Sequence, residues 1–446
     1  MSDRRKIFDL FEAQEEFMQT TVVQGIEKNR KGNAVLTVKD KNGNPVQNAC
    51  VKIKQLSHEF KFGANLFMLE EMETKEKNEL YKQRFAEVFN MATLPFYWDT
   101  LELEKGKPRY AKDSKKVYRR PPIDLCMEFC EKHGIEPREH GLAYDHFFPK
   151  WLRNESVESV KKEMERRYQE ISSRYADKIP TIEVTNENAC NNGSTAFYNE
   201  PDNVEWSFKK AEEYFPNNQL GINESNWIWL EEKWEDYYKC IQENIEKGAR
   251  IDAIGLQCHH FFSKEDEYGK SKYYLNPKHL YKRMDLFASF GKPLQITEIT
   301  FSAYSWEQED EEIQAEILEK VYSLFFSHES VEQIIYWNLA DGYAYVPSDD
   351  LEVIKKSQGD MRIGENYHYG GLLRFDLSEK PAFKKLKELT QKVWHTEESL
   401  QTNEKGETQF RGFYGEYQVE ICANGQIYTK TISLCKKQEN EFEIKL

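Results

Sequence analysis

The chain has 446 residues, and its 62 Lys and Arg against 77 Asp and Glu give a formal net charge of −15 at pH 7. Nucleic acids and anionic membranes bind proteins through clustered Lys and Arg, so this balance disfavours both as partners. A chain of this length is expected to hold one large domain with smaller appendages.

The first residues contain no pattern that directs secretion. MSDRRKIFDLFE carries charges every few positions and lacks the apolar stretch of a signal peptide, and no run approaches the ~18 apolar residues of a membrane span. The eight Cys are scattered, and Cys126 and Cys130 have the spacing of a helix core rather than of a zinc-binding pair. We therefore expect reduced thiols in a cytoplasmic protein, or a secreted protein if a signal has been removed.

Both ends of the chain have the alternating pattern of β-strands. Residues 33–55 alternate apolar and polar side chains around Asn-Gly-Asn-Pro, which predicts a β-hairpin or part of a small sheet. Residues 405–446 alternate in the same way around a second Asn-Gly turn, but a segment this short can barely form a core alone. We therefore expect an N-terminal segment 1–57 that contains β-strands, and a C-terminal segment 397–446 that packs with residues 33–55 as one discontinuous β module.

Residues 58–396 alternate eight times between short apolar runs and amphipathic stretches. Strands are predicted at 59–65, 90–96, 137–144, 181–186, 218–223, 251–257, 293–298 and 332–338. Helices are predicted at 75–89, 122–133, 156–176, 205–214, 229–248, 277–289, 307–326 and 380–394. Strands that alternate with helices form parallel sheets, and eight such units predict a (β/α)8 TIM barrel.

Two carboxylates stand where such a barrel places its chemistry, at the carboxyl ends of strands. Glu187 follows TIEVTN, and Glu298 closes PLQITE. Two carboxylates about 5–5.5 Å apart can hydrolyse a glycoside in two displacements. The alternative for each is a solvated charge at the start of a helix.

The neighbours of these carboxylates favour a sugar site. Sugar hydroxyls need donors and acceptors, and sugar faces need aromatic planes. Amide, imidazole and indole groups at strand ends supply both: Asn186, Gln257, His259 and Trp337. Adjacent side chains on a strand face opposite sides, so His259 and His260 are poorly placed to share a metal, and no metal or other cofactor is expected.

At these residues the sequence resembles the family 10 glycoside hydrolases, the endo-β-1,4-xylanases, from about residue 59 to 392. The strongest matches are Thr185-Asn186-Glu187 and Ile296-Thr297-Glu298. Further matches in the same order are Trp98 with Glu102-x-Glu104-x-Gly106, Pro149-x-Trp151, Asn223, the segment from Ile251 to His259, Leu372 to Asp376, and Lys380-Pro381-Ala382.

The resemblance implies roles that spacing alone does not give. It implies Glu187 as acid/base and Glu298 as nucleophile, with retention of configuration and a xylan-like substrate. It also implies that Asn186 binds the sugar beside the scissile bond and that His259 holds the nucleophile ionised. Such chemistry requires a protonated Glu187 and an ionised Glu298 near neutral pH.

The chain departs from the family pattern at positions that bind the sugar on the glycone side of the cleaved bond. Tyr97 stands where the family has a Lys, Tyr144-Asp145 replaces a Trp-His pair after a retained His140, and Tyr345 aligns with a Trp. We expect short or decorated xylo-oligosaccharides as substrates. The predicted substrate-binding residues are Asn186, His140, Tyr97, Trp98, Tyr144, Asp145, Asn223, Gln257, His259, Trp337 and Tyr345.

Three alternatives remain open. The altered positions also suit a weakly active or inactive carbohydrate-binding protein on the same barrel, or a hydrolase of another β-glycoside. An aldolase-like lyase would need a Lys or a metal at a strand end, and the sequence places neither at a predicted strand end.

Overall fold

The computed structural model describes residues 3–188, 193–225, 227–228, 233–348 and 350–446. Its centre is a closed barrel of eight parallel strands in the order β10-β3-β4-β5-β6-β7-β8-β9. The strands are β3 (Lys61–Asn65), β4 (Met91–Pro95), β5 (Glu136–His140), β6 (Thr181–Asn186), β7 (Gln219–Glu224), β8 (Ala253–His259), β9 (Leu294–Thr300) and β10 (Val331–Tyr336). The (β/α)8 prediction is confirmed.

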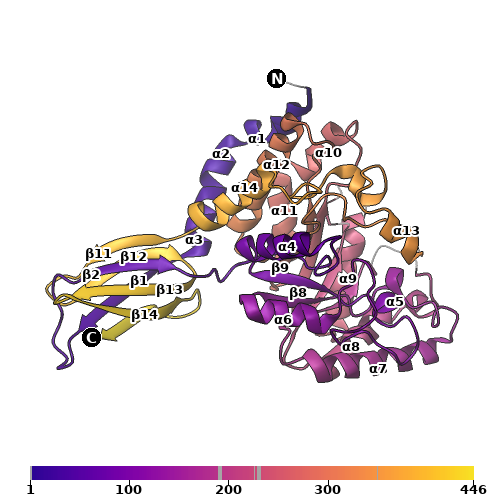
Figure 1. Ribbon diagram of the computed structural model, residues 1–446, viewed down its shortest axis with the longest axis horizontal. Helices are drawn as coiled ribbons and strands as arrows, with labels where there is room; N and C mark the ends of the chain where they lie inside the picture. Colours follow the sequence, from indigo (N-terminus) through magenta and orange to yellow (C-terminus); the bar gives the residue numbers. More distant parts are fainter. Residues whose placement is uncertain (1–2, 189–192, 226, 229–232, 349) are drawn as a thin grey trace.

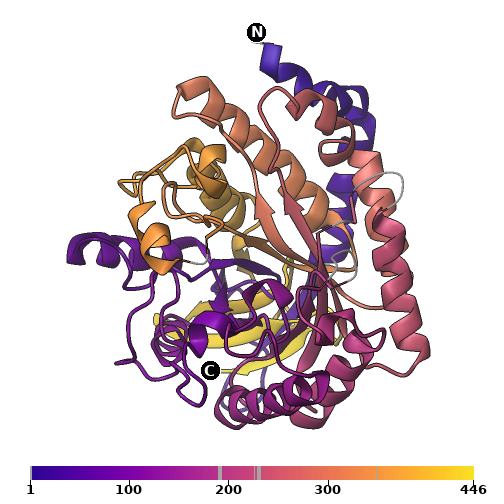
Figure 2. The same cartoon turned by 90° about the vertical axis from the view of Figure 1, so that its right-hand side faces the viewer.

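Helices follow the strands around the barrel (Figure 2). They are α4 (Lys75–Val88), α6 (Ile123–His133), α7 (Val157–Tyr175), α8 (Asn203–Tyr214), α9 (Lys233–Glu246), α11 (Pro277–Ala288), α12 (Gln308–Ser327) and α14 (Pro381–Glu388). Residues 229–232 of the predicted 229–248 helix lie outside the described residues. Shorter helices α5 (Trp98–Leu101), α10 (Glu267–Tyr274) and α13 (Leu351–Lys356) lie in the loops that follow β4, β8 and β10.

Local signals set the helix ends. The side chain of Thr74 accepts a hydrogen bond from the backbone N–H of Lys77 at the start of α4, and Ser156 caps α7 in the same way through Ser159. Such caps satisfy N–H groups that have no partner inside the helix. Helix α6 ends at Gly134, whose φ of 64° is the left-handed conformation that glycine adopts without strain.

The chain begins with helical segments that the sequence analysis did not predict. They are η1 (Asp3–Phe8), α1 (Asp9–Ala13), α2 (Glu15–Phe17), η2 (Met18–Val22) and α3 (Val23–Arg30), and they lie beside α10 and α12 (Figure 1). Arg4 forms ion pairs of 2.8 Å with both Glu267 and Asp310, while Phe8 and Phe11 are buried. Residues 3–30 therefore form part of the barrel's outer layer.

The remaining terminal residues form a two-sheet β module at one end of the barrel (Figure 1). One sheet has the order β12 (Glu407–Phe413), β1 (Lys31–Lys39), β15 (Glu441–Lys445), and the other β11 (Glu397–Gln401), β2 (Cys50–Gln55), β13 (Gly415–Ala423), β14 (Gln426–Leu434). The predicted discontinuous module is confirmed, including the hairpin of β13 and β14 around Asn424-Gly425.

The hairpin alternative for residues 33–55 is wrong, because β1 and β2 belong to different sheets. Each strand has one apolar face, and Leu36 of β1 packs in one buried cluster with Val51 and Ile53 of β2. Placing the two strands in facing sheets buries both apolar faces at once, which a two-stranded hairpin cannot do.

The cysteines and the helices can be compared with the expectations of reduced thiols and of no membrane span. The cysteines that the structure describes are free thiols, and Cys126 and Cys130 are buried on α6. Within the described ranges, no helix combines the length and the apolar character that crossing a bilayer would require.

Candidate active site

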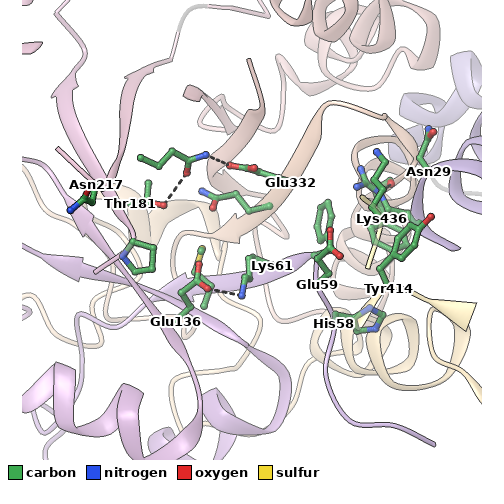
Figure 3. Close-up of a pocket in the computed structure, with 17 residues that line it drawn as sticks. Asn29, His58, Glu59, Lys61, Glu136, Thr181, Asn217, Glu332, Tyr414 and Lys436 are labelled. Carbon is green, nitrogen blue, oxygen red and sulfur yellow. Dashed lines mark hydrogen bonds and ion pairs between the residues drawn. The ribbon is translucent and has the colours of Figure 1, made fainter. Parts of the chain in front are cut away.

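The barrel has a cavity at each end, and the two differ in how their charges are paired. The cavity of about 440 Å³ at the amino ends of the strands lies beside the β module (Figure 3). There Lys61 forms a 2.7 Å ion pair with Glu136, and Gln219 donates a 3.0 Å hydrogen bond to Glu332. The second cavity, of about 410 Å³, lies at the carboxyl ends and contains Glu187 and Glu298. Barrel enzymes use this second end for chemistry.

Glu187 leaves β6 in an unusual backbone conformation. Its φ of 55° lies in the left-handed region, which costs free energy for a residue other than glycine and recurs at functional sites. Its N–H donates to the Asn223 carbonyl at 3.0 Å. The Tyr144 hydroxyl donates to Oε2 at 2.8 Å and the Gln257 amide donates to Oε1 at 3.1 Å. The carboxyl is thus fixed in direction from both sides.

Glu298 is buried on β9 and has a partner at each oxygen. Asn223 Nδ2 donates to Oε1 at 3.0 Å, and His259 Nε2 lies 3.1 Å from Oε2. Burial lowers the pKa of His259 to about 4, so the ring is neutral at pH 7. A neutral ring can donate its Nε2–H to Glu298. Its Nδ1 lies 3.1 Å from Thr300 Oγ1 and can accept a hydrogen bond from that hydroxyl.

The electrostatic balance at Glu298 differs from the sequence-based expectation. Burial raises the pKa of Glu298 to about 8, and the negative charges of Glu183 and Glu187 add to the rise while His140 opposes it. The carboxyl of the free site is therefore largely protonated at pH 7, whereas an ionised Glu298 was expected. The low-dielectric environment disfavours the charged form more strongly than the neighbouring donors favour it.

One amide network connects the two carboxyls. Asn186 Oδ1 accepts from Asn223 Nδ2 at 2.9 Å and from Gln257 Nε2 at 3.2 Å. These two donors are the same groups that reach Glu298 and Glu187 respectively. The Thr297 hydroxyl donates a 2.6 Å hydrogen bond to Asn223 Oδ1 and so fixes the orientation of the Asn223 amide. The relative position of the carboxyls is therefore set by side chains of four neighbouring strands.

A second buried network supports another part of the cavity wall. His140 Nδ1 lies 2.6 Å from Glu183 Oε1, and Arg138 Nη2 donates to Glu183 Oε2 at 2.5 Å. Burial raises the pKa of Glu183, but His140 and Arg138 outweigh it and the pKa is lowered. On its other side His140 Nε2 lies 2.9 Å from the Tyr97 hydroxyl. The ionised Glu183 thus orients both rings that face the cavity.

Aromatic rings complete that wall. The ring centres of Tyr97 and Phe147 lie 4.1 Å apart, Tyr144 and Phe147 5.3 Å, and His140 and Trp337 5.2 Å. Rings of this kind offer flat apolar faces beside polar edges, which suits the faces and hydroxyls of sugars. Two carboxyls and several aromatic rings in one cavity match the requirements of a glycan cleft.

Residues 56–388 match the model of glycosyl hydrolase family 10. The chain belongs to this family. Solved xylanases show the same fold: xylanase 10B from Thermotoga maritima has a TM-score of 0.59 at 21% identity, covering 75% of this chain and 96% of that one. Xylanase 10B from Thermotoga petrophila RKU-1, in complex with xylobiose, also has a TM-score of 0.59 at 21% identity, covering 75% of this chain and 95% of that one.

Curated relatives of this family 10 protein are distant in sequence. The anti-sigma-I factor RsgI6 of Acetivibrio thermocellus is 24% identical over 92% of this chain, and the chain spans 47% of that protein. A β-1,4-xylanase of Dictyoglomus thermophilum is 24% identical over 52% of this chain and 67% of its own length. Endo-1,4-beta-xylanase 2 of Arabidopsis thaliana is 23% identical over 90% of this chain and 33% of its own length.

The structure brings most of the predicted site residues of this family 10 protein to one cavity. The predicted residues that line it are Tyr97, His140, Tyr144, Asn186, Glu187, Gln257, His259, Glu298, Trp337 and Tyr345. Asn223 lies behind them and reaches the site through its hydrogen bonds to Asn186 and Glu298.

Two predicted residues lie away from the cavity. Trp98 is buried against Phe148, and its indole N–H donates to Glu102 at 2.9 Å. Asp145 accepts from the Ser194 N–H at 2.6 Å and from the Thr195 hydroxyl at 3.2 Å. The carboxylate of Asp145 thus fixes the loop after β6 instead of facing a sugar. Trp98 is thus part of the packing around α5, and Asp145 is occupied by its two backbone and hydroxyl donors.

Several lining residues were absent from the sequence-based set. They are Arg119, Arg120, His146, Phe147, Ser225, Phe261, Phe262, Tyr274 and Glu365. Arg119 and Arg120 belong to the long segment between α5 and α6, which has no periodic pattern that would place a side chain. His146 directly follows the altered Tyr144-Asp145 pair, and that adjacency was a usable signal. Across the described residues, no group of three His, Cys, Asp or Glu could hold a metal ion.

Proposed function

We propose that this protein is a retaining glycoside hydrolase that cleaves β-1,4-xylosidic bonds in short or decorated xylan-derived oligosaccharides. The observation that carries the proposal is the pair of carboxyls in one cavity, joined through Asn186 by the amides of Asn223 and Gln257. Membership of glycosyl hydrolase family 10 and the similarity to named xylanases support the same reaction.

The reaction takes two displacements. First, a carboxylate oxygen of Glu298 bonds to the anomeric carbon while the glycosidic C–O bond breaks and Glu187 gives its proton to the leaving oxygen. Next, Glu187 takes a proton from water, and the water oxygen displaces Glu298 from the anomeric carbon. The configuration at the anomeric carbon is inverted twice and so retained.

The surrounding contacts support each of these two roles in a different way. Asn223 and His259 hold the two oxygens of Glu298, which restricts the carboxylate to one direction of attack. Tyr144 and Gln257 hold Glu187, and the Tyr144 hydroxyl can either donate to or accept from a carboxyl that changes its protonation. The left-handed backbone of Glu187 presents that carboxyl toward the cavity instead of along the strand.

The protonation of Glu298 sets a condition for activity. The attacking form is the carboxylate, yet burial raises the pKa of Glu298 to about 8 in the free site. The positive charge that develops on the sugar in the transition state favours the ionised carboxylate. We therefore expect activity to increase with pH toward 8.

The cavity walls favour a short or branched chain. Tyr97 occupies the position of the family's Lys, and its hydroxyl is engaged with His140 at 2.9 Å. A cationic donor to sugar hydroxyls is thereby replaced by an aromatic face, which removes charge-assisted hydrogen bonds of about 1.5–3 kcal/mol each. Binding energy for a long unsubstituted chain is reduced on this side.

Product analysis tests the proposal. Purified protein is incubated with xylohexaose, with xylo-oligosaccharides bearing arabinose or glucuronic acid, and with cellohexaose, and the products are identified by mass spectrometry. Cleavage of the xylose-based chains, absent in a Glu298→Gln variant, is the expected result. Cleavage of cellohexaose alone would assign another β-glycoside, and intact substrates in every case would contradict the proposal.

A carbohydrate-binding role is the second candidate. It is favoured by the Tyr144 hydroxyl, which occupies Oε2 of the proposed acid at 2.8 Å. A relative that is 24% identical over 92% of this chain bears the name of an anti-sigma-I factor. Binding of xylo-oligosaccharides in calorimetry without any cleavage would favour this candidate.

A further inference from the structure

Two arginines line the active-site cavity and have no carboxylate partner in the part of the chain that the structure describes. Arg119 and Arg120 are 3% and 7% exposed, and both belong to the wall that also contains Tyr97 and Phe147. No ion pair joins either guanidinium to any Asp or Glu among the described residues. Buried arginines are normally paired, because an uncompensated buried charge is costly.

The hydrogen bonds of the two side chains leave donor groups unused. Arg120 Nη1 donates to the Arg119 carbonyl at 3.0 Å, which is the one hydrogen bond of this guanidinium among the described residues. The Nε–H groups of Arg119 and Arg120 are buried and have no acceptor in that part of the chain. Buried donors without acceptors are uncommon in folded proteins.

The surroundings of Arg120 hold it in place without neutralising it. Its guanidinium carbon lies 4.2 Å from the centre of the Tyr97 ring, 5.3 Å from that of Phe147 and 5.4 Å from that of Phe67. These rings stabilise a cation through their faces but accept no strong hydrogen bond. Burial lowers the pKa of Arg120 to about 10, so the group is charged at neutral pH.

Asp99 is a carboxyl whose charge raises the pKa of Arg120, but no ion pair joins the two groups among the described residues. Burial raises the pKa of Asp99, and its Oδ1 has no hydrogen-bond partner within the described ranges. The carboxyls of the cavity are engaged elsewhere: Glu298 with Asn223 and His259, and Glu365 with Asn338. Among the described residues, the positive charge beside Tyr97 is therefore left without a carboxylate partner, and it lines the cavity.

We propose that Arg119 and Arg120 bind a carboxylate on the substrate, so that the cleft selects β-glycans with a uronic acid at the sugar beside Tyr97. A guanidinium presents parallel N–H donors that match a carboxylate in a planar, bidentate arrangement. The unused donors, the missing internal partner and the position in the cavity all follow from such a ligand. The inference rests on the proposed function only for the glycan nature of the substrate.

Matched ligand pairs isolate the carboxylate. One set consists of xylo-oligosaccharides with a single glucuronic acid branch, and the other is the same set after reduction of each carboxyl to a hydroxymethyl group. A second pair, 4-nitrophenyl β-D-glucuronide and 4-nitrophenyl β-D-glucoside, differs only at C6. Binding is measured by calorimetry in a Glu298→Gln variant, which lacks the nucleophile of the first displacement, and kcat/KM is measured in the unaltered protein.

The variants distinguish a direct contact between Arg120 and the ligand carboxylate from a general effect of positive charge near the cavity. Arg120→Met keeps the length of the side chain and removes the cation, which a core tolerates well. Lys116→Met removes one positive charge from the same segment, where Lys116 is exposed and donates to the Glu70 carbonyl. Arg120→Lys keeps the charge and loses the planar pair of donors. Thermal unfolding confirms that each variant is folded.

We expect the acidic set to bind at least tenfold more tightly than the reduced set, with the preference lost in Arg120→Met, reduced in Arg120→Lys and kept in Lys116→Met. Equal binding of both sets, or an unchanged preference in Arg120→Met, would overturn the inference even if both sets are cleaved. Arginine-dependent binding of the acidic set without cleavage would support the inference and contradict the proposed hydrolase. Tighter binding of a 6-phosphorylated β-glucoside than of the glucuronide would assign a phosphate instead and overturn the uronic acid.

Discussion

The two ends of the barrel contain similar types of polar residue but treat their charges differently. At the amino end the Arg30 guanidinium donates to the backbone carbonyls of Phe326, His328 and Val331, and Lys61 is paired with Glu136 (Figure 3). At the carboxyl end Arg120 has no carboxylate partner among the residues that the structure describes, and burial raises the pKa of Glu298 to about 8.

This difference distinguishes polar groups that stabilise the fold from polar groups that bind a ligand. Paired groups at the amino end connect elements of the barrel and of its outer layer: Lys61 on β3 with Glu136 on β5, and Arg30 on α3 with carbonyls at the end of α12 and the start of β10. Uncompensated groups at the carboxyl end cost stability and are explained by a ligand that completes them. Changes at the carboxyl end should therefore reduce function and increase stability, and changes at the amino end should do neither to a large extent.

The largest effect is expected for Glu298→Gln. Loss of the nucleophile should lower kcat by about 10⁴-fold or more. Removing a buried carboxyl should raise the free energy of unfolding by about 0.5–2 kcal/mol at pH 8. Turnover on xylo-oligosaccharides and urea unfolding check both. Near-native turnover in this variant would remove Glu298 from the mechanism.

The stability gain of that variant should depend on pH in a defined direction. The pKa of Glu298 is raised in the folded protein from 4.5 to about 8, so the folded state retains the proton over this range while the unfolded state has lost it. Folding stability therefore decreases as pH rises from 4.5 to 8, and Glu298→Gln should lack this decrease. Parallel unfolding curves at pH 4.5 and 8 would contradict the assignment.

The next largest effect concerns activity against pH. If Glu298 must be ionised, kcat/KM should fall about tenfold per pH unit below 8. Asn223→Ala removes a hydrogen bond to Oε1 and should move this limb to higher pH, because a donor to the carboxylate favours its charged form. Measuring kcat/KM against pH with one aryl xyloside, for the unaltered protein and for Asn223→Ala, checks this. An acidic limb with its midpoint near pH 4.5 in the unaltered protein would contradict the expectation.

A smaller effect is expected for Tyr144→Phe. Loss of the 2.8 Å hydrogen bond to Glu187 removes one interaction with a charged group, which corresponds to about a tenfold decrease in kcat at about 1.4 kcal/mol. Because the ring remains, KM should change little. Steady-state kinetics separate the two constants, and a rise in KM at constant kcat would assign Tyr144 to substrate binding alone.

The smallest effect is expected at the amino end. Glu136→Gln breaks the 2.7 Å ion pair with Lys61, in which both side chains are partly exposed. Such pairs contribute about 0–1 kcal/mol, so the melting temperature should change slightly and kcat/KM not at all. A large loss of activity here would show that the two ends are coupled and would break the comparison.

The sequence predicted the barrel because each strand and helix has its own periodic signal. All eight predicted strands overlap observed ones, and 181–186 coincides with β6. The N-terminal helices were missed because segments such as Glu15–Phe17 are too short to establish a period. The hairpin at 33–55 was wrong because alternation fixes which faces are apolar but not which strand lies opposite.

The candidate site was predictable where function follows a strand end. Asn186, Glu187, Gln257 and Glu298 each end or follow a predicted strand, and all four line the cavity. Arg120 could not be found in this way, because its position depends on a long irregular segment folding back over Tyr97. The raised pKa of Glu298 likewise depends on burial, which a sequence pattern does not quantify.

The most direct test of the double displacement is the configuration of the first product. Proton NMR during hydrolysis of a xylo-oligosaccharide distinguishes the anomer released by the protein from the one formed later by mutarotation. Retention predicts that the β-anomer appears first. Initial release of the α-anomer would mean a single displacement by water and would contradict Glu298 as the nucleophile.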